Sequence, residues 1–197
     1  MTQYSDEDLL NAAAGLYGIV HVRQLTDILR RYGGSQRTRR QLADELAEGV
    51  PPHCAWKDGF LYCSDIDKTW EQWEEIIARS NHKAYYYPDP EAFLAYRDHH
   101  YIEHNASWQK LLAFIEAQND QIQGAKLLDE TALDLRQGKS PQQAMVHLLN
   151  AHLSFKEEQF KTFGSLFLCF YNDIRLYMNH GYTPEELKTQ HFNKKKS

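Results

Sequence analysis

The chain has 197 residues, of which 42% are hydrophobic and 25% charged, and its formal net charge is −5. This composition is normal for a soluble globular protein of one ordinary domain or two small ones, so a folded core is expected. The negative charge argues against a protein that wraps nucleic acid non-specifically, because phosphate neutralisation needs cations. The longest strongly apolar run, near Phe163–Tyr171, is too short to cross a bilayer, so no membrane partner is expected.

The cysteine content and the N-terminus suggest a cytoplasmic protein. Three cysteines are few and odd in number, which favours a reducing compartment over a disulfide framework. The opening MTQYSDEDLL is acidic and lacks a basic segment leading into an apolar one, so no secretory signal is expected. The sequence also lacks a glycine-rich phosphate loop, a G-x-S-x-G elbow and kinase motifs, and no cofactor is predicted.

Three helices are predicted before residue 50. Apolar residues recur at helical spacing in three segments: residues 6–17, 22–32 and 36–48. Ser5 is placed to cap the first helix and Ser35 to cap the third. Gly33-Gly34 ends the second and Gly49 the third. Gly18-Ile19-Val20 is interpreted as a short apolar link.

A β-hairpin is predicted next, over CAWKDGFLYC at residues 54–63. Asp58-Gly59 indicates a two-residue type I′ turn, which sets Trp56 opposite Leu61 and Cys54 opposite Cys63. Alternation then places these four side chains on one apolar face, packed on the helices. The two cysteines either form a bond or stay reduced as small core side chains, and a reducing cytoplasm favours the second. Three helices followed by a hairpin is the outline of a winged helix.

The remainder of the chain is predicted to be helical. A capping box at Thr69 begins a helix to about Arg79, and an extended connector at 81–90 marks a domain boundary. Helices are then expected near 89–104, 107–118 and 120–137. Another begins at Pro141 and either pauses at Ser154 or continues to Met178, and a short one follows Thr183. The predicted fold class is mainly α, with a winged-helix-like domain at 1–80 and an all-helical domain at 81–197.

Aromatic residues recur along the helix that leads to Met178. They form a stripe at helical spacing, which is more typical of a core than of a cofactor pocket: Phe160, Phe163, Phe167, Phe170, Ile174 and Tyr177. Cys169 lies within this stripe and is predicted to be buried and unreactive.

An arginine cluster at the start of the third helix is the first candidate site. Five arginines lie between Asp27 and Asp44 with no acid among them: Arg30, Arg31, Arg37, Arg39 and Arg40. Such a cluster, with Lys57 at the hairpin tip, could contact phosphates and read bases. Against this, residues 1–80 hold nine Lys or Arg and thirteen Asp or Glu, a net charge of −4. The alternatives are double-stranded DNA binding and a solvated or partner-facing patch.

A histidine cluster is the second candidate. His100, Glu103 and His104 match the H-x-x-E-H spacing of inverted zinc peptidases, in which two histidines hold zinc and the glutamate activates water. A helix would place both histidines on one face. The sequence shows no further acidic ligand, so the alternatives are a surface cluster with simple metal affinity and a solvated helix face.

Two segments resemble a known group of proteins. Leu16-Tyr17-Gly18-Ile19-Val20 before a helix, and the C-terminal HGYTPEEL at 180–187, resemble uncharacterised bacterial proteins. These pair an N-terminal winged-helix-like region with a helical remainder ending in a G-x-T-P-x-E-L-like segment, in some cases near a SEC-C zinc motif. The paired cysteines of that motif are missing here, so the resemblance implies neither zinc nor a known activity.

The predicted function is that of a non-enzymatic cytoplasmic adaptor or regulator that binds protein or double-stranded DNA. The contacts are assigned to Arg37, Arg39, Arg40 and Lys57. The alternative is a metal-dependent hydrolase built on His100, Glu103 and His104. The sequence leaves open whether the chain forms a homo-oligomer.

Overall fold

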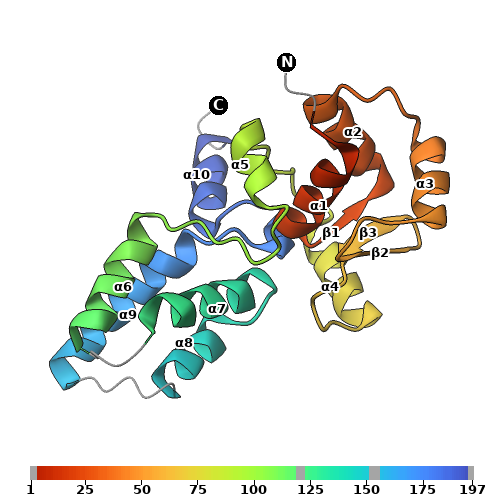
Figure 1. The fold of residues 1–197 in the computed structure, drawn as a ribbon. Coiled ribbons are helices and arrows are strands. Elements are labelled where there is room, and N and C mark those ends of the chain that lie inside the picture. The colour runs from red at the N-terminus through yellow and green to blue at the C-terminus, as the bar shows by residue number, and fades with distance from the viewer. Residues whose placement is uncertain (1–3, 119–122, 151–155, 195–197) are drawn as a thin grey trace. The chain divides into compact units, whose positions relative to one another are not determined.

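The computed structural model describes residues 4–118, 123–150 and 156–194 (Figure 1). The protein is mainly helical with one three-stranded antiparallel sheet, which confirms the predicted fold class. Contacts divide the chain into two compact units, Met1–Tyr101 (unit 1) and Ile102–Ser197 (unit 2). The boundary expected after residue 80 therefore falls inside unit 1.

Unit 1 contains three helices, the sheet and two further helices. The elements in chain order are α1 (Asp6–Tyr17), β1 (Ile19–His21), α2 (Val22–Gly33), α3 (Arg39–Glu48), β2 (Cys54–Lys57), β3 (Phe60–Cys63), α4 (Trp70–Ser80) and α5 (Pro90–Ala95). The strand order is β1-β3-β2. β1 occupies the segment interpreted from the sequence as a link. Its strand character comes from pairing with β3, about 40 residues later in the chain, and local alternation does not indicate it.

The hairpin has the predicted register and turn. Cys54 pairs with Cys63 and Trp56 with Leu61 across β2 and β3. Asp58 and Gly59 have φ angles of 51° and 83°, the positive values that a type I′ turn requires. Cys54, Leu61 and Cys63 are buried and Trp56 is half-buried, so this face of the hairpin packs on the core of unit 1.

One of the predicted helix caps is wrong. Ser5 caps α1 as expected, accepting a hydrogen bond from the backbone N–H of Asp8 at 3.1 Å. The third helix, however, begins after Thr38 and not after Ser35. Thr38 and Gln41 form a reciprocal capping box, which satisfies two backbone donors and outcompetes a single serine cap.

The segment expected to connect two domains packs on unit 1. Phe93 of α5 is fully buried in its core. The Tyr17 hydroxyl donates to the carbonyl of Tyr86 at 2.6 Å, and the Tyr32 hydroxyl to the carbonyl of Pro88 at 2.7 Å. The aromatic side chains and carbonyls of this segment thus complete unit 1, which is why the boundary lies later in the chain.

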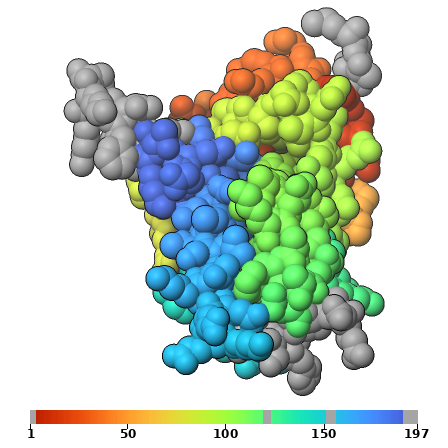
Figure 2. Space-filling view, turned by 90° about the vertical axis from the view of Figure 1, so that its left-hand side faces the viewer, coloured from red at the N-terminus to blue at the C-terminus, as the bar shows by residue number. Residues whose placement is uncertain are grey.

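The described residues of unit 2 form helices joined by loops and contain no strand. Its elements are α6 (Ala106–Gln118), α7 (Gly124–Arg136), α8 (Pro141–Asn150), α9 (Glu157–Asn172), the 3₁₀ turn η1 (Tyr177–Asn179) and α10 (Pro184–Lys194). The α6 and α9 helices lie side by side, green and blue in Figure 2. Since α9 ends at Asn172, the predicted continuation to Met178 is wrong, and the pause expected at Ser154 lies outside the described residues.

The aromatic stripe forms much of the core of unit 2. Phe163, Phe167 and Phe170 are buried, whereas the Phe160 side chain is 48% exposed. Cys169 is exposed, so its predicted burial is wrong: the helix turns it away from the face that carries the three buried phenylalanines. None of the described helices is both long and apolar enough to cross a membrane.

Candidate functional site

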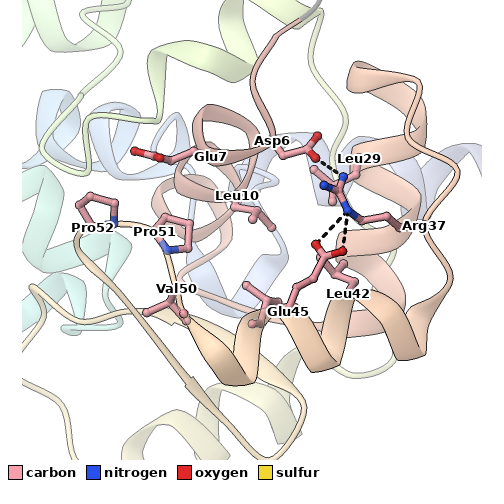
Figure 3. Close-up of a pocket in the computed structure, with 12 residues that line it drawn as sticks. Asp6, Glu7, Leu10, Leu29, Arg37, Leu42, Glu45, Val50, Pro51 and Pro52 are labelled. Carbon is pink, nitrogen blue, oxygen red and sulfur yellow. Dashed lines mark hydrogen bonds and ion pairs between the residues drawn. The ribbon is translucent and has the colours of Figure 1, made fainter.

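The arginine cluster divides between two sides of α3. Arg37, which precedes the helix, points toward α1, where it donates to a carboxylate oxygen of Asp6 (Figure 3). Its Nε lies 2.9 Å from a carboxylate oxygen of Glu45. Arg37 therefore holds the start of α1 and the middle of α3 together, and its guanidinium is already engaged by two acids.

Arg39 and Arg40 form the first turn of α3 and are exposed. The Arg40 side chain is 93% exposed, and its Nε lies 3.9 Å from the carboxylate of Asp44, one turn along the helix. An ion pair this exposed contributes little to stability. Only Leu42 and Leu46 of α3 are buried, so the outer face of the helix has no packing role within unit 1.

The start of α2, the start of α3 and the hairpin turn meet around His21. The backbone N–H of Val22 donates to the carbonyl of Gly59 at 2.9 Å, which ties the turn to the start of α2. Burial lowers the pKa of His21 below its usual value, and the nearby cations of Arg39 and Arg23 lower it further. Arg23, which the sequence did not single out, thus lies near His21, as Arg39 does.

The Lys57 and His21 side chains lie on the same face of the sheet. Phe60 is the register partner of both His21 on β1 and Lys57 on β2, so these three side chains form a row across one face. The Lys57 ammonium lies 4.5 Å from the centre of the Trp70 ring, in a cation–π contact at the start of α4. Lys57 is exposed, and Glu71 of α4 lies near its charge: hydrogen bonding lowers the pKa of Glu71 and the Lys57 ammonium lowers it further.

We call Arg23, Arg39, Arg40 and Lys57 the cationic surface. All four are exposed and come from α2, α3 and β2. Acids also border it, among them Asp44 on α3, Asp58 in the turn and Glu71 on α4. Exposed guanidinium and ammonium groups from several elements can contact phosphates at separate points, which is how a protein is oriented on a duplex.

The histidine cluster does not form the arrangement that the sequence suggested. The chain from residue 101 to 105 is not helical, so the spacing of His100 and His104 does not place them on one helical face. Glu103 accepts from Arg175 Nε at 2.9 Å, and the His104 ring stacks on Trp108 with 3.8 Å between ring centres. The residue that would activate water is thus engaged in a half-buried ion pair.

A buried thiol–imidazole pair lies elsewhere in unit 1. The His99 Nε2 is 3.1 Å from the backbone carbonyl of Asn11, which can only accept, so this nitrogen carries the proton. Nδ1 is then the acceptor, and Cys63 Sγ donates to it at 3.0 Å. Burial raises the pKa of Cys63 to about 11 and that of Cys54 to about 12, which keeps both thiols protonated at neutral pH.

Two neighbours extend this pair. Asp65 lies 2.8 Å from His53 Nδ1 and 3.9 Å from His99 Nδ1. Cys63 and Asp65 thus both approach His99 Nδ1, and Asp65 also contacts His53. In the part of the chain that the structure describes, no group of three or more His, Cys, Asp or Glu side chains could hold a metal ion.

Comparison of the chain with protein-family models, with curated proteins and with solved structures finds no match.

Proposed function

We propose that unit 1 is a winged-helix-like module of a non-enzymatic regulator and that its cationic surface binds double-stranded DNA. The order α1, β1, α2, α3, β2, β3 supports the module: two helices and a short strand precede a third helix and a hairpin. In such an arrangement the third helix is free to enter a groove while the hairpin contacts the backbone beside it.

The exposed first turn of α3 carries the proposal. Arg39 and Arg40 are exposed there, and Arg23, Arg39 and the hairpin turn are all near His21. Long exposed cations cost little to redirect toward phosphates, because they hold no buried partner in unit 1. Arg37 is left out of the interface, since Asp6 and Glu45 already bind its guanidinium.

The charge of unit 1 sets the strength of the interaction. Residues 1–101 hold eleven Lys or Arg and sixteen Asp or Glu, a net charge of −5. Repulsion from the remaining acids limits the number of phosphates neutralised to the four cations of the surface. Since log K falls by roughly 0.9 per neutralised phosphate for each tenfold rise in salt concentration, four phosphates give an expected slope of about −3.6 against log salt.

A fluorescence-anisotropy titration of labelled duplex DNA with the full chain, at ionic strengths from about 50 to 200 mM, tests the proposal. Arg39→Glu/Arg40→Glu is expected to weaken binding at least tenfold and to flatten the salt slope by about 2. The control is Lys110→Glu/Lys126→Glu, which makes the same change in net charge on exposed residues of unit 2. Equal losses in both double variants, or no binding by the unmodified chain, would rule out the cationic surface as a DNA-binding site.

A further inference from the structure

A hollow lies between α3, the start of α1 and the segment 49–52 (Figure 3). Its volume is about 280 Å³, enough for one or two large side chains. The hollow belongs entirely to unit 1, because all the residues that line it lie between Asp6 and Pro52.

The floor of the hollow is apolar. It is formed by leucines from three helices and by the segment that follows α3: Leu10, Leu29, Leu42, Leu46, Val50 and Pro51. Val50 is 37% exposed and is one of four large hydrophobic side chains exposed among the described residues. The four leucines are already buried, so an apolar side chain seated here would remove mainly Val50 from water, at about 25 cal/mol for each Å² buried.

The rim of the hollow is acidic. Asp6, Glu7 and Glu45 border it, and the single cation among the lining residues is Arg37. Three carboxylates against one guanidinium leave a net charge of −2 around an apolar floor. Arg37 binds Asp6 and Glu45, whereas Glu7 is exposed and its carboxylate points away from Arg37 in Figure 3.

We propose that this hollow binds a short segment of a protein partner that combines a large apolar side chain with a neighbouring lysine or arginine. The apolar side chain enters between Leu10 and Leu46, and the cation lies against Glu7. Arg37 illustrates this attraction between the rim and a cation, because two carboxylates of the rim, Asp6 and Glu45, bind its guanidinium. An acidic segment, including a nucleic-acid backbone, would be repelled by the −2 charge.

The proposal can be tested by selection from a library of random 12-residue peptides displayed on phage, with the full chain as target. Selected sequences are expected to place Leu, Ile or Phe within a few residues of Lys or Arg. The synthetic form of an enriched peptide is then titrated by fluorescence polarisation. Glu7→Lys is expected to weaken its binding at least tenfold. The matched control Glu71→Lys, which makes the same change at the second residue of α4, is expected to leave it within twofold.

Three results would overturn the proposal. The first is no enrichment above a target-free selection, and the second is an enriched peptide that binds Glu7→Lys as well as the unmodified chain. The third is self-association in sedimentation velocity that Glu7→Lys abolishes, because the occupant would then be a second copy. Peptide binding should persist in Arg39→Glu/Arg40→Glu, so the hollow and the DNA-binding surface can fail separately.

Discussion

The hairpin cysteines should make unit 1 lose stability in mild alkali. Burial raises the pKa of Cys54 to about 12 and that of Cys63 to about 11. An unfolded thiol has a pKa of about 8.5. Because the folded values are higher, the folded chain holds protons that the unfolded chain releases. The stabilisation is complete below about pH 8.5 and is lost as the pH rises toward the folded values.

The size of the loss follows from these pKa values. Between pH 7.5 and 9.0 an unfolded thiol with a pKa of about 8.5 releases enough protons to lower the free energy of unfolding by about 0.8 kcal/mol. The two thiols together give about 1.5 kcal/mol. Burial also raises the pKa of Tyr17 and Tyr85, but unfolded phenols titrate near pH 10 and contribute little at pH 9.0.

Urea unfolding at pH 7.5 and 9.0 in the presence of a reductant measures this loss. Trp56, Trp70 and Trp73 lie in unit 1, so tryptophan fluorescence mainly follows that unit. The chain with Cys54→Ala/Cys63→Ala starts from a lower stability but should lack the fall of about 1.5 kcal/mol, and each single variant should retain about half of it. Parallel falls in the unmodified and double-variant chains would refute the assignment of the loss to these thiols.

Three further substitutions test the local structure. Thr38→Ala should lower the free energy of unfolding by about 1 kcal/mol, whereas Ser35→Ala should change it by less than about 0.5 kcal/mol; equal effects in urea unfolding would contradict the observed start of α3. Gly59→Ala should cost about 1–2 kcal/mol, because its φ of 83° suits glycine; unchanged thermal stability would argue against the type I′ turn. Arg175→Met should cost about 2–3 kcal/mol, since it removes the partner of Glu103 and Glu186; a stability gain in thermal unfolding would contradict a structural role for this ion pair.

The parts of the fold that the sequence predicted correctly depend on neighbouring residues. Asp58-Gly59 and the alternation around it determine the hairpin and its register within ten residues. The cap of α3 was mistaken although its signal is also local: Thr38 and Gln41 have the spacing of a capping box, whereas Ser35 has only the residue type. The strand β1 has three residues, too few for a pattern of its own, and exists through its pairing with β3.

The site depends more on contacts between distant residues, which explains why only part of it was predicted. Arg39, Arg40 and Lys57 are exposed as a binding role requires. Arg37 is engaged by Asp6, 31 residues earlier, and no local pattern indicates that pairing. The bond between Cys63 and His99 likewise joins residues 36 positions apart. His100 and His104 have helical spacing, but the chain between them is not helical.

The most direct test of the DNA-binding proposal is a chemical-shift map of the isotope-labelled full chain titrated with duplex DNA at low salt. The largest amide shifts are expected at Arg39 and Arg40, at the start of α2 beside Arg23, and in the turn after Lys57. The amides of α6 to α9 should not move. Shifts concentrated in unit 2, or no saturable shifts in the first turn of α3, would contradict the proposal.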